Sequence, residues 1–319
     1  MKDIVQLLPN MRKILIPIDK SDASERAVKF AACLLTPLSE RVVTKIVLLH
    51  VLGISFVEKM AANIDTRVAA LKESPLFKRL AEEYINKEIK PLLDKAEEYL
   101  KTAGVKCKIE KEVIEGDPTK EITNFAKQND IHTIIMGRRR RSALKEHVLG
   151  SCSYAVCHRP GRHTDYIVGQ KDIDITACPI PKILVPFDGS EYALNALREA
   201  EGLILAFPQG VIKITVVHVI ESAYADQLEE IEEAKQILEQ ARKELLAQGV
   251  SEAIIQTELR YGDPAEEIVQ AAEEGGHNII MMGRTGKSGL KELVLGSVSS
   301  RVLHLAEGPT VALVSSSDD

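Results

Sequence analysis

The sequence predicts an α/β protein built from two tandem, doubly wound domains, each with a five-stranded parallel sheet. Two observations support this prediction. Four ordered blocks of sequence recur between the two halves of the chain, and within each half short β-branched runs alternate with amphipathic helical segments. The length of 319 residues agrees with about two domains of ordinary size.

The repeat consists of four pairs of matching segments. KILIPIDKSDASERAVKFA from Lys13 matches KILVPFDGSEYALNALREA from Lys182, IVLLHVL matches ITVVHVI, VIEGDPTKEITNFA matches LRYGDPAEEIVQAA, and IIMGRRRRSALKEHVLGSCS matches IMMGRTGKSGLKELVLGSVS. The first repeat is longer by roughly 22 residues between its second and third blocks, near residues 53–80, where the sequence looks helical and polar. We expect domains at 1–170 and 181–319, joined by a linker at 171–180.

The elements of the second repeat follow one another along the chain. KILVPF predicts a first strand, Ser190 caps the helix after it, and IKITVVHV predicts a second strand buried on both faces. An amphipathic helix over 222–248 leads to a third strand, SEAIIQTELR. Asp263-Pro264 opens the next helix, NIIMMG is the fourth strand, Gly296-Ser297 opens the last helix, and TVALVS is the fifth strand. This alternation implies a parallel sheet with helices on both faces.

The first repeat follows the same order until its end, where we place the fifth strand near 164–169. The fifth strand of the second repeat, TVALVS, would be an apolar sheet edge, and such an edge aggregates unless it is paired. The fifth strand of the first repeat, near TDYIVG, is its natural partner.

Composition narrows the class of protein. An apolar fraction of 45% and a charged fraction of 28% are typical of a globular domain. A net charge of −6 and the absence of Trp argue against nucleic-acid binding. We expect no membrane span, no secretory signal and a cytoplasmic protein. Five cysteines without a CxxC pair predict reduced thiols rather than disulfides or a zinc site.

The candidate site lies where ligands bind in doubly wound sheets, at the carboxyl ends of the strands. In the second repeat Asp188 ends the first strand, His218-Val219 end the second, and the loop from Gly283 follows the fourth and leads to Gly296-Ser297. Glycines let backbone N–H groups approach an anion, and a helix N-terminus offers free donors. These features suit a phosphate, with Asp188 accepting from an adenine amino group or a ribose hydroxyl. A Gly-rich loop with a Ser cap explains the spacing alone equally well.

Two other nucleotide motifs do not fit. Gly286-Lys287-Ser288 resembles the end of a P-loop, but Met281 stands where that motif has its first glycine. No GxGxxG follows the first strand.

On these residues the chain resembles the universal stress proteins of tandem type over nearly its whole length. The ATP-binding pattern of that family, Gly-x2-Gly-x9-Gly-(Ser/Thr), fits the second repeat fully. The resemblance implies an adenine-nucleotide-binding fold, an intramolecular pseudo-dimer formed through the fifth strands, and ATP, with or without Mg, as the ligand. The residues that it assigns to the nucleotide are Pro186, Asp188, Val219, Gly283, Arg284, Gly286, Gly296 and Ser297.

The first repeat departs from this pattern. A weaker second pocket is predicted from Asp19, Val51, Gly137, Gly150 and Ser151, but Arg140 stands at the second glycine. An arginine is disfavoured there if the backbone needs a positive φ. Three interpretations remain open: the run Arg138–Arg141 fills the pocket, its guanidinium groups hold a phosphate or an acidic partner, or it is a solvated loop.

The other polar residues have simpler explanations. His50 and His218 occupy equivalent strand positions typical of core histidines, and Asp117 and Asp263 sit in turns where they can cap helices. We predict no catalytic residue and no metal ligand.

The leading hypothesis is a non-enzymatic ATP-binding stress-response or signalling protein whose first half is a degenerate scaffold or regulatory half. The alternatives are a slow ATPase or nucleotidyl-transfer enzyme, and a structural interaction protein with empty pockets. The expected partners are an adenine nucleotide and either a protein partner or a second copy of the chain, with neither nucleic acid nor membrane.

Overall fold

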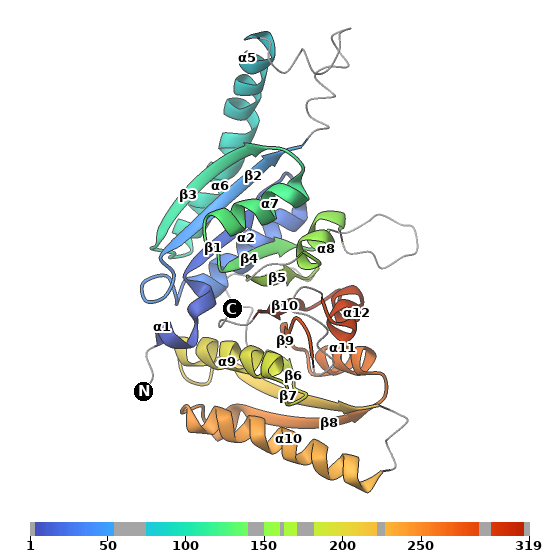
Figure 1. Cartoon of the computed structure of the whole chain (residues 1–319). Coiled ribbons are helices and arrows are strands. Elements are labelled where there is room, and N and C mark those ends of the chain that lie inside the picture. Colours follow the sequence, from blue (N-terminus) through green and yellow to red (C-terminus); the bar gives the residue numbers. More distant parts are fainter. Residues whose placement is uncertain are drawn as a thin grey trace.

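The two halves of the chain form one continuous ten-stranded sheet (Figure 1). A computed structural model describes residues 4–53, 75–139, 150–159, 163–170, 182–221, 227–286 and 295–315. The strand order is β3-β2-β1-β4-β5-β10-β9-β6-β7-β8, so the second half repeats the order of the first in the opposite direction. The predicted fold class, two doubly wound five-stranded domains packed within one chain, is confirmed.

The strands of each half are parallel to one another, as predicted. The first half contains β1 (Lys13–Pro17), β2 (Lys45–Leu52), β3 (Lys108–Glu115), β4 (Thr133–Gly137) and β5 (Thr164–Val168). The second contains β6 (Lys182–Pro186), β7 (Lys213–Ile220), β8 (Ile255–Tyr261), β9 (Ile279–Gly283) and β10 (Thr310–Val314). The outer strands β3 and β8 have only half-buried and exposed residues and carry charged side chains, which discourages pairing with other chains.

The helices cover both faces of the sheet. In the first half they are α1 (Ile4–Leu7), the short turn η1 (Pro9–Met11), α2 (Asp22–Leu35), α5 (Pro75–Tyr84), a π-helical turn η2 (Ile85–Ile89), α6 (Lys90–Thr102), α7 (Pro118–Gln128) and α8 (Ser151–Cys157). In the second half they are α9 (Glu191–Ala206), α10 (Leu228–Ala247), the turn η4 (Glu252–Ile254), α11 (Pro264–Glu274) and α12 (Ser297–Leu305).

Alternating strand residues divide the core into two layers. Ile14 and Ile16 of β1 belong to a buried cluster that also contains residues of α2, α6, α9 and α10, whereas Leu15 between them belongs to a second cluster with residues of α7, α8, α11 and α12. Each layer runs through both halves of the chain. The predicted caps form: the Ser190 hydroxyl accepts from the N–H of Ala193, at 3.2 Å.

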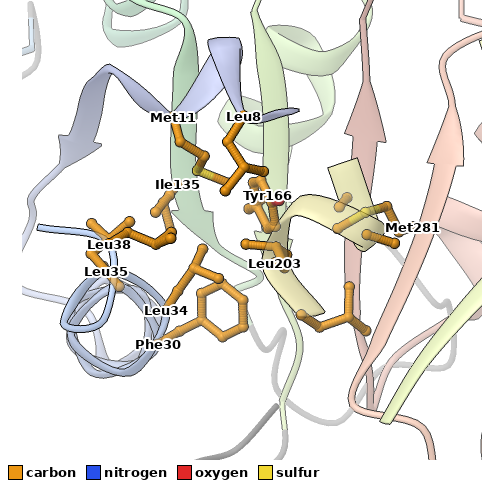
Figure 2. Close-up of a cluster of buried hydrophobic side chains, with 14 of the residues drawn as sticks. Leu8, Met11, Phe30, Leu34, Leu35, Leu38, Ile135, Tyr166, Leu203 and Met281 are labelled. Carbon is orange, nitrogen blue, oxygen red and sulfur yellow. The ribbon is translucent and has the colours of Figure 1, made fainter. Parts of the chain in front are cut away.

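The halves join where β5 and β10 pair antiparallel, with Tyr166 opposite Ala312. Both strands are fully buried, so the expected pairing of the two apolar edges is confirmed. Figure 2 shows Tyr166 in a cluster of buried side chains that takes Phe30 from the first half and Leu203 and Met281 from the second. The core is therefore continuous across the junction.

Some predicted features lie outside the described residues. These are residues 54–74 of the extra segment, Arg140 and Arg141, Lys287 and Ser288, and the linker at 171–180. The domain boundaries stay a prediction. The part of the extra segment that is described, from Pro75 onward, is helical and continues through η2 into α6.

Candidate functional site

A cavity lies at the carboxyl ends of the strands in each half, and these two cavities are equivalent in position. Their volumes are about 340 Å³ in the first half and about 310 Å³ in the second. Both lie at the lower end of the range usual for small-molecule sites. The second cavity is lined by seven of the eight residues predicted for it, namely Pro186, Asp188, Val219, Gly283, Gly286, Gly296 and Ser297.

The second cavity opens because β6 ends before its neighbour β7. The last pair between these strands is Pro186 with Val217, after which the N–H of Phe187 donates to the carbonyl of Val217 at 2.8 Å. Backbone groups alternate sides along a strand, so the N–H and C=O of Val219 point the same way as those of Val217. They are thus directed past the end of β6 and into the cavity that Val219 lines.

Asp188 is oriented by the helix that follows it. Its Oδ1 accepts from the N–H of Ser190 at 2.9 Å. Its Oδ2 faces Gly286, where an added Cβ would lie only 2.8 Å away. The absence of a side chain at Gly286 therefore gives the Asp188 carboxylate room at the wall of the cavity.

The glycine loop is joined to the start of α12. The N–H of Gly296 donates to the carbonyl of Arg284 at 2.8 Å, and the Ser299 hydroxyl donates to the carbonyl of Gly283 at 2.9 Å. Gly296 is the N-cap residue of α12 and Ser297 its first residue. The positive end of a nine-residue helix therefore faces the cavity, an arrangement that suits an anion.

Gly283 serves a packing purpose that the sequence did not reveal. A Cβ at this position would lie 2.7 Å from Cβ of Tyr192 and 2.8 Å from its backbone carbonyl, on α9. In the first half a Cβ on Gly137 would lie 1.9 Å from the carbonyl oxygen of Ala23. The first glycine of each loop thus allows a strand to approach a helix closely.

The first cavity is lined by all five residues predicted for the weaker pocket, Asp19, Val51, Gly137, Gly150 and Ser151. It differs from the second by an arginine: Arg139 donates to Oδ2 of Asp19, while Ser21 donates to Oδ1. Burial raises the pKa of Asp19, but the hydrogen bonds from Ser21 and Arg139 outweigh it, so the pKa is lowered. The equivalent of Arg139 in the second half is Thr285, which is too short for such a contact.

The side chain of Arg284, predicted to contact the nucleotide, points away from the second cavity. It does not line the second cavity; its guanidinium crosses to the first half and donates to Oδ2 of Asp165 at 2.6 Å and to the carbonyl of Cys157 at 2.5 Å. We therefore correct the predicted set: only the backbone of Arg284, through Gly296, belongs to the glycine loop.

The turn aspartates have the structural roles expected of them, and the two histidines are hydrogen-bonded as expected but are half-buried and line the cavities. Nδ1 of His50 donates to the carbonyl of Ile18, and Nδ1 of His218 donates to that of Phe187, each at 2.7 Å. Burial lowers the pKa of His50. Asp117 and Asp263 accept from backbone N–H groups and cap α7 and α11.

The described residues also bear on thiols, metal ions and membrane spans. Four cysteines there are free thiols, namely Cys33, Cys107, Cys152 and Cys157. No group of three or more His, Cys, Asp or Glu side chains in this part of the chain could hold a metal ion. Among the same residues, no helix is long and apolar enough to cross a membrane.

Buried polar groups at the junction were missed by sequence reasoning. Glu199 of α9 accepts from the hydroxyl of Tyr166 at 2.5 Å and from Nδ2 of Asn10 at 3.2 Å. Arg138 is 2% exposed and donates to the carbonyls of Leu303 and His304 in the second half. The one available signal was that Arg138 and Arg284 occupy matching positions in the two repeats.

Comparisons with known proteins agree with this architecture. The model of the universal stress protein family matches residues 10–160 and 179–313. The chain is 36% identical over 141 residues to universal stress protein MJ0531 of Methanocaldococcus jannaschii, covering 41% of this chain and 81% of that protein. It is 34% identical over 145 residues to YxiE of Bacillus subtilis, covering 41% and 96%. A universal stress protein structure from Archaeoglobus fulgidus covers 96% of this chain and 98% of that one, with a TM-score of 0.67 and 21% identity, which supports the fold.

Proposed function

Because the chain belongs to the universal stress protein family, we propose that it binds an adenine nucleotide in the cavity of its second half. In this proposal it acts as a non-enzymatic stress-response or signalling protein. The supporting observation is the convergence of three elements on one cavity: the Asp188 carboxylate, the backbone of Val219, and the loop leading to Ser297. The residues fit an adenine nucleotide better than a generic anion, because only part of the cavity is suited to negative charge.

Each part of the ligand has a matching group. Val219 offers an N–H donor and a C=O acceptor side by side, which complement the ring nitrogen and amino group on one edge of adenine. Asp188 accepts from a ribose hydroxyl or an amino group. The phosphates lie toward Gly296 and Ser297, where N–H groups and the helix dipole stabilise negative charge. ATP is the proposed nucleotide, and Mg would be held mainly by its phosphates.

The first half is proposed to be a degenerate nucleotide site. Its cavity has a similar volume, but Arg139 engages Asp19, the counterpart of Asp188. A nucleotide would have to displace this contact. The chain would then hold about one nucleotide, with the first half as a scaffold or regulatory half.

The test is mass spectrometry of nucleotide released from the purified, denatured protein, with its molar ratio to the chain. About one ATP or ADP per chain supports the proposal, and about two shows that the first cavity also binds. Absence of nucleotide, together with no binding of added Mg-ATP in calorimetry, contradicts it in favour of a structural interaction protein. Metal-dependent phosphate release that is lost in Ser297→Ala would instead identify an enzyme.

A further inference from the structure

The two matching arginines each cross the junction to the last helix of the other half. Arg138 follows Gly137 in the loop of the first cavity and donates to the carbonyls of Leu303 and His304. These carbonyls lie at the end of α12, which Figure 1 shows beside β10 at the junction of the halves. A residue of the first half therefore holds a helix of the second.

That helix is the one whose other end forms the phosphate side of the second cavity. α12 runs from Ser297 to Leu305, nine residues, so its ends are about 13 Å apart. A cation at the carboxyl end of a helix interacts favourably with the negative end of its dipole. It adds positive potential along the helix axis, toward Gly296 and Ser297.

The charge of Arg138 is buried, and none of the contacts described for it is with a carboxylate, although the charge of Glu307 beyond α12 attracts it. Its side chain is buried, and the bonds described above go to neutral carbonyls. Burial lowers its pKa to about 10, with the charge of Glu307 acting in the opposite direction, so the guanidinium stays protonated near neutral pH. Low exposure also keeps salt ions away from it.

Its counterpart Arg284 differs both in the pairing of its charge and in the helix that it contacts. The guanidinium of Arg284 is paired with the buried carboxylate of Asp165, which cancels its charge locally. The helix that it contacts, α8, has only seven residues. The two crossings are therefore not equivalent. Among the contacts described, Arg284 is paired with a carboxylate and Arg138 is not. Arg138 is also the one of the two that contacts α12, the helix of the proposed nucleotide site.

We infer that Arg138 is a positioning residue for the nucleotide cavity of the second half: it fixes the carboxyl end of α12 and favours phosphate at the opposite end. This inference rests on the proposed function. A unit charge about 13 Å away, at an effective dielectric constant of about 20, changes the affinity for one added negative charge by roughly tenfold. Adenosine carries no phosphate, so its binding should depend little on Arg138.

The experiment measures dissociation constants of ATP and adenosine by calorimetry with the full chain. Arg138→Gln is the main variant because it retains an N–H donor for the carbonyls and removes the charge. Arg138→Lys keeps the charge. Arg26→Met is the control: Arg26 is also buried in the first half, and the hydrogen bonds described for its guanidinium go to the carbonyls of Gly169 and Arg138. Thermal unfolding reports the stability of each variant.

The expected result is a loss of about tenfold in ATP affinity in Arg138→Gln with adenosine affinity nearly unchanged, while Arg138→Lys and Arg26→Met keep most of the preference for ATP. Equal weakening of both ligands, or no change in either, overturns the inference while leaving the proposed function intact. If the unaltered chain binds neither ligand, the proposed function fails and the inference fails with it. If Arg138→Gln does not fold, loss of the preference in Arg138→Lys overturns the charge argument, and its retention supports it.

Discussion

Replacing Gly286 by alanine should impair nucleotide binding while leaving the fold intact. The added Cβ would lie 2.8 Å from Oδ2 of Asp188, closer than real Cβ atoms come. Because the nearest atom belongs to a side chain, the carboxylate can rotate away and the backbone need not move. A hydrogen bond to a charged group contributes about 1.5–3 kcal/mol, so its loss from a bound nucleotide weakens binding roughly 10- to 150-fold.

Gly283→Ala provides the contrast within the same loop. Its Cβ would meet the backbone of Tyr192 at 2.8 Å, and α9 cannot yield there without disturbing the core. Overpacking of this kind costs about 1–3 kcal/mol, which lowers the melting temperature by roughly 2–4 °C for each kcal/mol. A larger residue such as valine at Gly283 is expected to affect folding as well as binding.

Calorimetry with ATP and thermal unfolding, applied to Gly286→Ala, Gly283→Ala and Asp188→Ala, test this reasoning. We expect Gly286→Ala and Asp188→Ala to lose affinity with little change in melting temperature, and Gly283→Ala to melt earlier. ATP binding of ordinary strength in both Gly286→Ala and Asp188→Ala would refute the assignment of the site. Early melting of Gly286→Ala would refute the claim that its contact is limited to a side chain.

Three further predictions concern the first cavity and the junction. Arg139→Thr breaks an exposed ion pair worth about 0.2–1 kcal/mol. This change alone should therefore improve the nucleotide affinity of the first cavity less than about fivefold. When it is combined with Arg140→Gly, calorimetry should detect a second nucleotide per chain. Burial raises the pKa of Glu199, so its carboxyl group binds a proton more tightly in the folded chain than in the unfolded chain. The free energy of unfolding should therefore rise as the pH falls from neutral toward about 4.5. Glu199→Gln should remove this rise, because the side chain then carries no titratable proton, measured by urea unfolding at several pH values. Asp165→Asn leaves Arg284 buried without its carboxylate and should reduce the free energy of unfolding by about 3 kcal/mol or more, measured by urea unfolding at pH 7.

The elements that the sequence predicts well are those whose signal is local. β7 is a β-branched run, and its burial on both faces follows from that composition. The caps at Ser190 and Asp263 need only their own side chain and the next turn of backbone. The pairing of β5 with β10 was also predictable, because an apolar edge strand needs a partner and the other repeat carries one.

What the sequence could not supply depends on contacts between distant segments. From the sequence, a glycine in this loop is interpreted as a phosphate-binding feature. The structure adds that Gly283 is required for packing, because Tyr192 leaves no room for a Cβ there. The direction of a long side chain is equally undetermined, so Arg284 was assigned to the ligand although its guanidinium lies in the other half. Nothing in the sequence distinguishes Glu199 from a surface carboxylate on a helix, because its partners Tyr166 and Asn10 come from distant segments.

If only the second half binds nucleotide, as proposed, the contacts at the junction give the first half a role in that binding. The loop of the first half has Arg139 on the Asp19 carboxylate, so it is poorly suited to a ligand. The neighbouring residue Arg138 nevertheless reaches α12, whose start forms the phosphate side of the second cavity. A second half expressed alone would lack this cation and would expose β10, a fully buried strand, as a free sheet edge. On this reasoning the proposed nucleotide site depends on both halves, although the residues that line its cavity come from the second.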